Sequence, residues 1–419
     1  MRIVIVGAGI VGVTTAYELA LQGHEVTVYE RRGSVASEAS FASGGLLAPG
    51  LVAPSAAPGM PWQVARQLFG GPARLRPGGL GALAQLPWLW RWWRACRPRV
   101  HGPNGAAMHR LAQFSAARLQ ELTRSLNLEF EQTPGVVMLM RGERELKAAQ
   151  GSLSLLRDWG VPHHVVDAKR CRELEPGLNE HTNLHAAVHL SQHGAGNCRQ
   201  FAQLLKTEAQ HQGARFRFDT AVRSLSAGTT PAVVLANGLT VPCDAIVVCA
   251  GVGARALLAG AGVRLPLAPV HGVSITAPLR HLDGLHAPGP RGALTDARHD
   301  IVIARLGHRV RVAGGTELGG DPGRPAPAAL RRLYRVLDDW FPGAVLAREA
   351  QHWKGAQPML PDGPPVLGES GAPGVWLNLG HGASGWTLAC GSALVLAERL
   401  SGRDAPLDMA GLTVARLRG

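Results

Sequence analysis

The chain contains few cysteines, and their arrangement excludes two classes of small domain. Six cysteines are scattered through 419 residues, with no CxxC pair and no Cys/His spacing typical of a zinc module. Neither a disulfide scaffold nor a bound metal is therefore expected. Cysteines without such pairing are typical of a reducing compartment, so we expect a cytoplasmic protein.

A long apolar run is also missing. The nearest approach, residues 245–263, contains four glycines and Arg255 and has the pattern of a strand, a turn and a helix. A membrane-spanning helix needs about 20 predominantly apolar residues, so none is expected. Residues 2–13 do not predict a secretory signal either, because no small-residue cleavage site follows them.

Aromatic residues are few, at 5%, whereas basic residues outnumber acidic ones by 43 to 30. The net charge of +13 is compatible with nucleic acid, an anionic membrane surface or an acidic substrate as partner. The basic residues are mostly arginines spread along the chain, and they rarely alternate with aromatics. We therefore expect no nucleic-acid partner. At roughly 150 residues per domain, the length predicts two or three globular domains.

Glycine is abundant, and the first glycines form a nucleotide-binding pattern. The β-branched run Arg2–Val6 is followed directly by Gly7-Ala8-Gly9-Ile10-Val11-Gly12, a predicted helix, and a second strand at Glu25–Tyr29. In this βαβ context the glycines allow a tight turn, close approach of a pyrophosphate and close helix–strand packing. Glu30 is placed to accept hydrogen bonds from a ribose diol, and its charge disfavours a 2′-phosphate. The motif predicts FAD or NAD rather than NADP.

A second glycine-rich turn lies near the end of the chain. Val375–Leu379 is a predicted strand, Gly380-His381-Gly382 a tight turn, and Trp386–Leu400 a buried apolar helix. Backbone N–H groups at such a helix N-terminus suit an anion. In a flavoenzyme this anion is the reduced ring system, which the amides of Gly385–Thr387 would stabilise. His381 is either part of this site or a structural histidine of the turn.

The region between these motifs predicts further α/β structure and a second kind of sheet. Asn197–Gln212 is a predicted Asn-capped helix, and Asp244–Gly251 is a further strand that runs into a glycine turn. Residues 129–140, 270–277 and 301–313 are rich in β-branched residues. They predict strands of a second, more antiparallel domain.

Together these motifs carry a resemblance to a known family. The segments GAGIVGVTTAYELALQGHEVTVYER, ASFASGGLLAPGLVAPSAAPGMP, PDGPPVLG and GHGASGWTLACGSALVLAERLSGR, with the terminal LTVAR, resemble the small, FAD-containing subunit of bacterial D-amino acid dehydrogenase. That family lies in the D-amino acid oxidase/glycine oxidase superfamily. The resemblance implies a Rossmann-like FAD-binding domain, 1–85, 185–268 and 350–419, and a mostly antiparallel substrate domain, 86–184 and 269–349.

The implied reaction is hydride transfer to flavin from the carbon that bears the amine. The resulting imine hydrolyses to a 2-oxo acid and ammonia. The implied partners are an amine or amino acid substrate and, as electron acceptor, a quinone. Three alternatives remain open: an oxidase of the same fold, a non-catalytic FAD-binding subunit of a larger complex, and an RNA-associated flavoprotein.

The resemblance also implies which residues form the site. Beyond the first glycine motif, it implies these cofactor-binding residues: Glu30, Arg31, Ser43, Gly44, Gly45, Leu46, Val222, Gly251, Gly355, Gly380, His381, Gly382, Gly385, Trp386 and Thr387. The positions it places closest to the reaction are occupied by His381, Gln357, His299 and His271.

The sequence departs from the family where the substrate is expected. Relatives have an arginine that clamps the substrate carboxylate, and Gln357, which carries no charge, stands in its place. A Lys-Gly-Tyr of the relatives is His271-Gly272-Val273 here, and a tyrosine expected near position 299 is His299.

Two interpretations of these departures are open. In the first, another arginine takes over the clamp and the substrate is still an amino acid; the candidates are Arg298, Arg305 and Arg311. In the second, the substrate is a bulky, cyclic or carboxylate-free amine.

One segment concentrates aromatic and basic residues. Residues 86–99, LPWLWRWWRACRPR, hold four of the ten tryptophans together with four arginines. This composition suits a membrane interface, with rings at the headgroups and charges on anionic lipid. Residues 88, 92 and 95–96 also fall at helical spacing, which favours packing on the core. The segment predicts either peripheral binding to the inner face of the inner membrane or an ordinary amphipathic helix.

Overall fold

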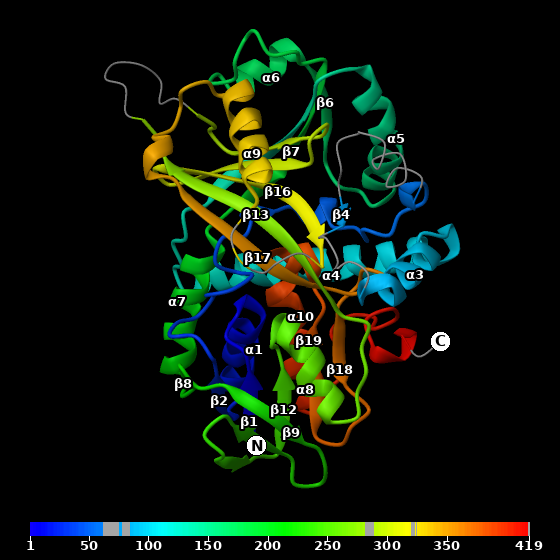
Figure 1. The fold of residues 1–419 in the computed structure, drawn as a ribbon, viewed down its shortest axis with the longest axis vertical. Helices are drawn as coiled ribbons and strands as arrows, with labels where there is room; N and C mark the ends of the chain where they lie inside the picture. The colour runs from blue at the N-terminus through cyan, green and yellow to red at the C-terminus, as the bar shows by residue number, and fades with distance from the viewer. Residues whose placement is uncertain (62–74, 78–83, 281–288, 320–322, 324, 418–419) are drawn as a thin grey trace.

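The structure is a computed structural model that describes residues 1–61, 75–77, 84–280, 289–319, 323 and 325–417. Its two main sheets lie one above the other in Figure 1, with six strands below and ten above. The first and the last strands of the chain both belong to the lower sheet, so this sheet is completed only when distant segments meet.

The lower sheet is parallel apart from one edge strand. The order of its strands is β18-β19-β12-β1-β2-β8, and only β18 pairs antiparallel with its neighbour. In chain order they are β1 (Arg2–Val6), β2 (Glu25–Tyr29), β8 (Arg215–Arg217), β12 (Ala245–Val248), β18 (Val366–Glu369) and β19 (Val375–Leu379). The bounds of β1, β2 and β19 match the predicted ranges, whereas β12 is shorter than its prediction.

Both faces of this sheet are covered. In β1, Ile3 and Ile5 pack into a core with the helices on one face, and Val4 and Val6 pack into a second core on the other. Consecutive apolar residues are what a parallel strand buried on both faces requires. The covering helices are α1 (Ile10–Leu21), α4 (Pro98–Ser125), α7 (Cys198–His211), α10 (Gly385–Leu400) and, on the opposite face, α8 (Ala254–Gly260). The opposite face also carries a small sheet of β9 (Val222–Ser226), β10 (Ala232–Leu235) and β11 (Thr240–Pro242).

The upper sheet is mostly antiparallel, as predicted. Eight of its strands follow the order β17-β13-β16-β15-β14-β5-β7-β3, while β4 pairs with β16 and β6 with β7. In chain order they are β3 (Leu46–Leu47), β4 (Leu75–Pro77), β5 (Thr133–Met140), β6 (His164–Asp167), β7 (Ala186–Ala195), β13 (Ala268–Pro278), β14 (Ala293–Asp296), β15 (Ile301–Leu306), β16 (Arg309–Leu318) and β17 (Gln351–Met359). The predicted strand 301–313 is two strands joined by a tight turn.

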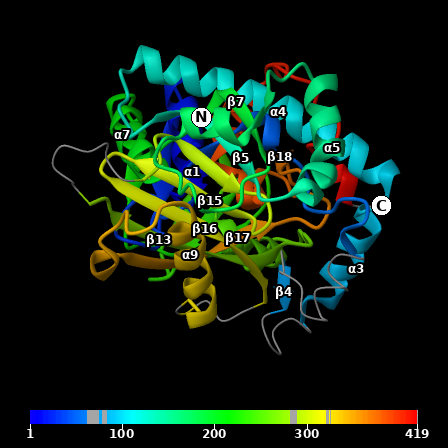
Figure 2. The same ribbon diagram turned by 90° about the horizontal axis from the view of Figure 1, so that it is seen from above.

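Helices pack on the outer face of the upper sheet. Leu333, Leu337 and Trp340 of α9 (Pro327–Trp340) share a core with Val310 and Val312 of β16. Figure 2 shows β13, β15 and β16 crossing the molecule, with α9 on one side and α4 on the other. Two further helices lie in this part of the chain, α5 (Glu143–Asp158) and α6 (Ala168–Leu174).

The predicted domain boundaries cut through the upper sheet. β3, β7 and β17 lie within segments that the resemblance assigns to the FAD-binding domain, yet they pair in the ten-stranded sheet. The boundaries also include residues 62–74, 78–83, 281–288, 320–322 and 324, which lie outside the described residues. The division into two domains at these positions stays a prediction.

The segment rich in tryptophan and arginine forms α3 (Leu86–Ala95). Trp88 and Trp92 are buried against Val270 of β13, as the helical spacing predicts. Trp90 and Trp93 are exposed on the other face. Among the described helices, none combines the length and the apolar character needed to cross a membrane.

Candidate functional site

A cavity of about 380 Å³ lies where the two sheets meet. One wall comes from the loops after β1, β2, β12 and β19, because the carboxyl ends of parallel strands meet at one edge of a sheet. The other wall comes from β17 and from loop 37–43. These predicted cofactor residues line it: Gly7, Gly9, Ile10, Val11, Glu30, Arg31, Ser43, Val222, Gly251, Gly380, His381, Gly382, Gly385 and Trp386.

The first glycine motif shapes one end of the cavity. Gly7 has a φ of +102°, which favours glycine, and a Cβ on Gly12 would lie 1.9 Å from the Gly7 carbonyl oxygen. Helix α1 can therefore begin directly against β1 only with these two glycines. Glu30 accepts hydrogen bonds from the backbone N–H groups of Ala8 (2.7 Å) and Arg32 (2.9 Å). These bonds hold its carboxylate beside the N-terminus of α1, where a ribose and a pyrophosphate would lie.

The second glycine turn shapes the other end. His381 is buried, and its Nε2 lies 3.0 Å from Ser392 Oγ, which itself donates to the Ala389 carbonyl at 3.1 Å. In this network Nε2 carries the ring proton and donates to Ser392. Burial lowers the pKa of His381 to about 3, so the imidazole is neutral at physiological pH. The sequence left open whether His381 belongs to the site or is a structural residue of the turn. In the structure it lines the cavity and also holds α10 through Ser392.

Several polar atoms around the cavity are buried without a partner among the described residues. They are Ser43 Oγ, Gln357 Oε1, Asn378 Oδ1 and Trp386 Nε1. Leaving such a group unpaired costs about 1–3 kcal/mol, so a polar ligand is expected to satisfy them. These residues fit FAD: Glu30 would hold its adenosine end, and Gln357 and Trp386 would lie beside its ring.

The remaining predicted cofactor residues lie behind the residues that line the cavity and form part of its wall. A Cβ on Gly44 would lie 3.5 Å from Ala313 of β16, and one on Gly355 would lie 2.9 Å from Trp353 Nε1. Leu46 pairs with β7, and its carbonyl accepts a hydrogen bond from Thr387 Oγ1 at 3.2 Å. Gly12 and Gly45 likewise pack behind the lining residues.

Of the four residues predicted nearest the reaction, Gln357 and His381 line the cavity. His271 does not, because it pairs with Ala356 in the β13–β17 ladder whereas Gln357 pairs with Val270. Directly paired residues point to the same face of a sheet and successive residues to opposite faces. The side chain of His271 therefore lies on the face opposite Gln357, so its predicted place beside the substrate is wrong.

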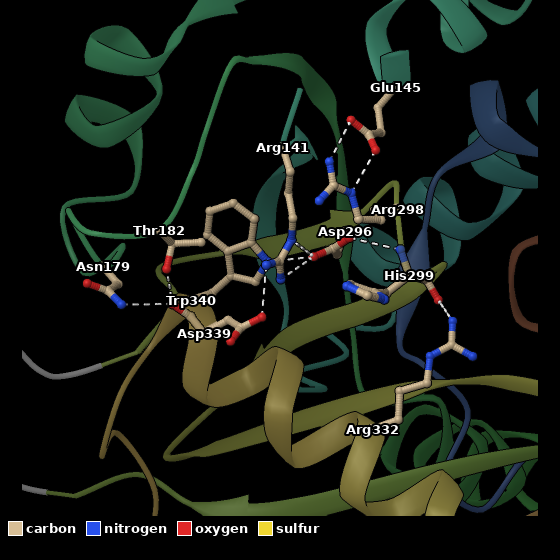
Figure 3. Close-up of polar contacts among 10 residues, drawn as sticks. All are labelled: Arg141, Glu145, Asn179, Thr182, Asp296, Arg298, His299, Arg332, Asp339 and Trp340. Atoms are coloured by element: carbon tan, nitrogen blue, oxygen red, sulfur yellow. Dashed lines mark hydrogen bonds and ion pairs between the residues drawn. The ribbon is translucent and has the colours of Figure 1, made fainter. Parts of the chain in front are cut away.

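His299 also lies away from the cavity, in a polar network on the outer part of the upper sheet (Figure 3). Its backbone N–H donates to Asp296 Oδ1 at 2.9 Å, and burial lowers the pKa of its ring. Asp296 is fully buried and also accepts from Arg141 Nε and Trp340 Nε1, each at 2.8 Å. His299 therefore belongs to the turn between β14 and β15 and has a structural role there. Its match in sequence to the family's tyrosine did not indicate this location.

The three candidate arginines have different surroundings. Arg298 pairs with Glu145 at 2.7 Å in the network of Figure 3, and Arg305 donates to a backbone carbonyl in its own turn. Arg311 is buried and donates to Thr276 Oγ1 (3.0 Å) and to the Ser43 carbonyl (3.1 Å). Burial lowers its pKa to about 10, so it stays protonated at neutral pH. Arg311 therefore supports the loop that carries Ser43 without lining the cavity.

Three lining residues carry no motif that sequence reasoning can use. Ser40 Oγ accepts from the Ile10 N–H at 3.1 Å, and Asn378 and Cys198 complete the wall. They come from a loop, a strand and the start of a helix that meet only in the folded chain. Gln357 could be predicted as a site residue because it stands at the position of a family arginine. Ser40, Asn378 and Cys198 match no such family position.

A parallel nucleotide-binding sheet joined to a curled antiparallel sheet, with a cavity between them, defines the fold of two-domain flavin oxidoreductases. Solved structures share it: glycine oxidase from Geobacillus kaustophilus superposes with a TM-score of 0.76 at 20% identity, covering 99% of this chain and 98% of that one. L-proline dehydrogenase from P. horikoshii does so with a TM-score of 0.74 at 19% identity, covering 100% and 97%.

Sequence comparison then gives the family. Residues 2–399 match DAO, the FAD dependent oxidoreductases, and the chain belongs to that family. It is 40% identical to a D-amino acid dehydrogenase of Cereibacter sphaeroides over 422 residues, covering 99% of this chain and 95% of the relative. It is 35% identical to a D-amino acid dehydrogenase of Bradyrhizobium diazoefficiens, covering 99% of both chains. The predicted fold, cofactor class and family are confirmed.

Proposed function

We propose that this protein is a D-amino acid dehydrogenase that oxidises the carbon bearing the amine and passes a hydride to FAD. The imine product then hydrolyses to a 2-oxo acid and ammonia. The observation that carries the proposal is that one continuous cavity has Glu30 at one end and Gln357, His381 and Trp386 at the other. The two relatives at 35–40% identity are named for the same activity.

The residues at the two ends have different tasks. Bound FAD supplies the hydride acceptor. At the first end, Glu30 would accept hydrogen bonds from the ribose hydroxyls, and the N-terminus of α1 would hold the pyrophosphate. At the second end, the amides of the first turn of α10 would stabilise the negative charge of the reduced flavin. The neutral His381 holds this turn through Ser392 without adding a charge of its own.

Gln357 is the group that would meet the substrate carboxylate. The NH2 group of a glutamine donates only neutral hydrogen bonds, and from a single nitrogen, where an arginine can donate two parallel charged ones to a carboxylate. Among the described residues, the arginines that line the cavity are Arg31 and Arg223, and both lie near Glu30 and Val222. We infer that the carboxylate is held by Gln357, with weaker binding than an arginine clamp gives, and that the amine and the side chain contribute more to recognition.

The decisive experiment follows the absorbance of the flavin in the purified holoenzyme without oxygen. D-Amino acids with small and large side chains, their L-enantiomers and cyclic imino acids are added one at a time. The proposal expects bleaching by D-amino acids and none by their L-enantiomers. A colourless protein, or a flavin that no D-amino acid reduces, would contradict it. Reaction of the reduced enzyme with oxygen then separates a dehydrogenase from an oxidase.

We infer further that the outer face of α3 binds an anionic membrane surface. Trp90 is 59% exposed and Trp93 44% exposed, and their rings stack with centroids 5.1 Å apart. Arg97 lies over the Trp93 ring at 5.7 Å, and Arg91 and Arg94 are exposed on the same helix. Exposed indole rings among guanidinium groups match a headgroup region of anionic lipid.

Vesicle sedimentation tests this surface. The protein is expected to pellet with phosphatidylglycerol vesicles at low salt, to be released by high salt, and to remain in solution with phosphatidylcholine vesicles. Changing both Trp90→Ala and Trp93→Ala should abolish pelleting. Leu239→Ala, which removes an equally exposed apolar side chain elsewhere, should leave it unchanged. Equal pelleting of both variants would dismiss the surface.

A further inference from the structure

A second cavity of about 380 Å³ lies behind the first turn of α10, where Thr387 lines it. Its walls are α4, the start of β5, the end of β7 and the segment that contains β3. Its volume is within the range of pockets that hold small organic ligands. Nothing in the reaction of the substrate requires this cavity, so its chemistry has to be considered separately.

The cavity has a polar rim and an apolar floor. Gln120, Arg124, Gln132 and Gln192 are exposed at its rim. The buried lining residues Pro49, Leu119 and Ala195 form its apolar floor, with the partly buried Leu47 and Ala116 beside them and Pro134 exposed at the edge. No acidic residue is among its described lining residues. Such a funnel suits a flat, uncharged ring that carries hydrogen-bond acceptors.

Two buried donors in the floor lack acceptors. Gly50 donates its N–H to His193 Nε2 at 3.0 Å, so the ring proton of the neutral imidazole is on Nδ1. Burial lowers the pKa of His193 to about 4, which keeps the ring neutral. His193 Nδ1 and Thr133 Oγ1 are both buried, and no described residue partners either atom. Each can donate to a carbonyl oxygen of a ligand.

The wall between the two cavities is thin. Trp386 lines the first cavity and its neighbour Thr387 lines the second. Likewise Ser43 lines the first cavity and Leu47 lines the second. Leu46, which precedes Leu47 in the chain, accepts a hydrogen bond from Thr387 through its carbonyl oxygen. A ligand in the second cavity would therefore lie one layer of residues behind the turn that faces the flavin ring. This position suits electron transfer and excludes direct contact with the amino acid.

We propose that the second cavity binds the ring of a quinone, which reoxidises the reduced flavin. The proposal rests on the proposed function, because it requires a flavin that has been reduced. Reduced flavin loses two electrons, and the quinone takes these with two protons to become a quinol. His193 and Thr133 hydrogen-bond the quinone carbonyls, and the apolar floor holds the ring. The cavity lies at residues 116–124 of α4, far along this helix from α3, so membrane binding by α3 is a separate property.

The test uses holoenzyme whose flavin is reduced by light and EDTA, so that no amino acid substrate is needed. It is mixed without oxygen with a short-chain, water-soluble benzoquinone, and flavin reoxidation is followed by stopped flow. Ala116→Trp fills the cavity from α4 and should slow reoxidation at least tenfold. Ala117→Trp places the same ring on the neighbouring exposed position and should leave the rate unchanged. Flavin content and thermal unfolding are compared for both.

A second variant separates a ligand contact from a structural one. Thr133→Val removes a hydroxyl that has no protein partner among the described residues, so the fold should be as stable as before. The quinone concentration for half-maximal reoxidation rate should rise several-fold. The proposal is overturned if Ala116→Trp reacts like the wild type, or if wild-type reoxidation does not saturate with quinone. Failure of the proposed function instead appears as D-amino acids that do not reduce the flavin, while photoreduction and quinone reoxidation proceed.

Discussion

The hydroxyl of Thr387 donates to the backbone carbonyl of Leu46 across 3.2 Å, which joins the first turn of α10 to β3. β3 in turn pairs with β7 of the ten-stranded sheet. The first turn of α10, which lines the main cavity with Gly385 and Trp386, is therefore fixed to the sheet whose strand β17 lines the same cavity. One hydrogen bond thus ties α10, which covers the six-stranded sheet, to the ten-stranded sheet in the wall between the two cavities.

The close approach of α1 to β1 predicts the effect of Gly12→Ala. A Cβ at this position would lie 1.9 Å from the Gly7 carbonyl oxygen, and neither backbone can yield without moving the phosphate site. We expect the variant to lose about 3 kcal/mol of stability and to be purified without FAD. Gly151→Ala is the control, since its Cβ would meet no atom within 4 Å on α5. Normal flavin content in Gly12→Ala, measured by absorbance, would contradict this account.

The missing charge at Gln357 predicts a gain of affinity in Gln357→Arg. Its side chain lies beside Gly272, and a Cβ on Gly272 would lie 3.3 Å from Gln357 Nε2. Because Gly272 has no Cβ, it leaves room there for a longer side chain at position 357. A guanidinium can form a two-point, charged contact with a carboxylate, so KM for D-alanine should fall about tenfold. KM for D-alaninamide, which lacks the carboxylate, should not fall. A parallel decrease for both substrates would show that Gln357 does not face the carboxylate.

The network of Figure 3 predicts a large stability difference between two carboxylates. Asp296→Asn leaves the guanidinium of Arg141 partly unpaired in a fully buried site, so a loss of about 3–5 kcal/mol is expected. Glu145→Gln breaks the more exposed pair with Arg298 and should cost less than about 1 kcal/mol. Denaturant unfolding of the holoenzyme measures both. Equal losses would show that the buried carboxylate has no special role in tying β14 to α9.

Two buried histidines predict how stability depends on pH. The pKa is lowered to about 3 in His381 and to about 4 in His193, both by burial. Between the ordinary histidine pKa of roughly 6.5 and pH 4, the unfolded chain binds these protons and the folded chain does not. Stability therefore falls as the pH falls through this window, by about 1.4 kcal/mol per pH unit for each histidine. His381→Gln should reduce this slope by about one proton, as measured by unfolding at pH 6.5, 5.5 and 4.5; an unchanged slope would contradict a neutral His381.

The local motifs of this chain could be predicted from the sequence because each depends on residues that are close together in the chain. β1, the glycine motif and β2 lie within thirty residues, and their spacing already dictates a phosphate site at the start of α1. The same holds for β19 and the turn before α10. The Asn197 cap of α7 could be predicted as well, because its side chain accepts the Gln200 N–H only three residues away.

The cavity wall formed by β17 was harder to predict from the sequence, because it depends on strand register. His271 and Gln357 lie on adjacent strands, and only the pairing of His271 with Ala356 reveals that their side chains point to opposite faces. His299 was assigned by its position relative to a family motif, but its turn is held by Asp296 and Arg332 on the outer side. A shift of one residue in a strand reverses the face, and no local pattern records it.

By itself, the sequence determined the FAD-binding framework, the family resemblance and the loss of the charged clamp, because these reside in short motifs and single positions. Tertiary structure decided which residues surround the cavity. It placed Ser40, Cys198 and Asn378 at the site, removed His271 and His299 from it, and set a second cavity behind Thr387. The physical reason is that such neighbours come from segments far apart in the chain, and only strand register and helix packing bring them together.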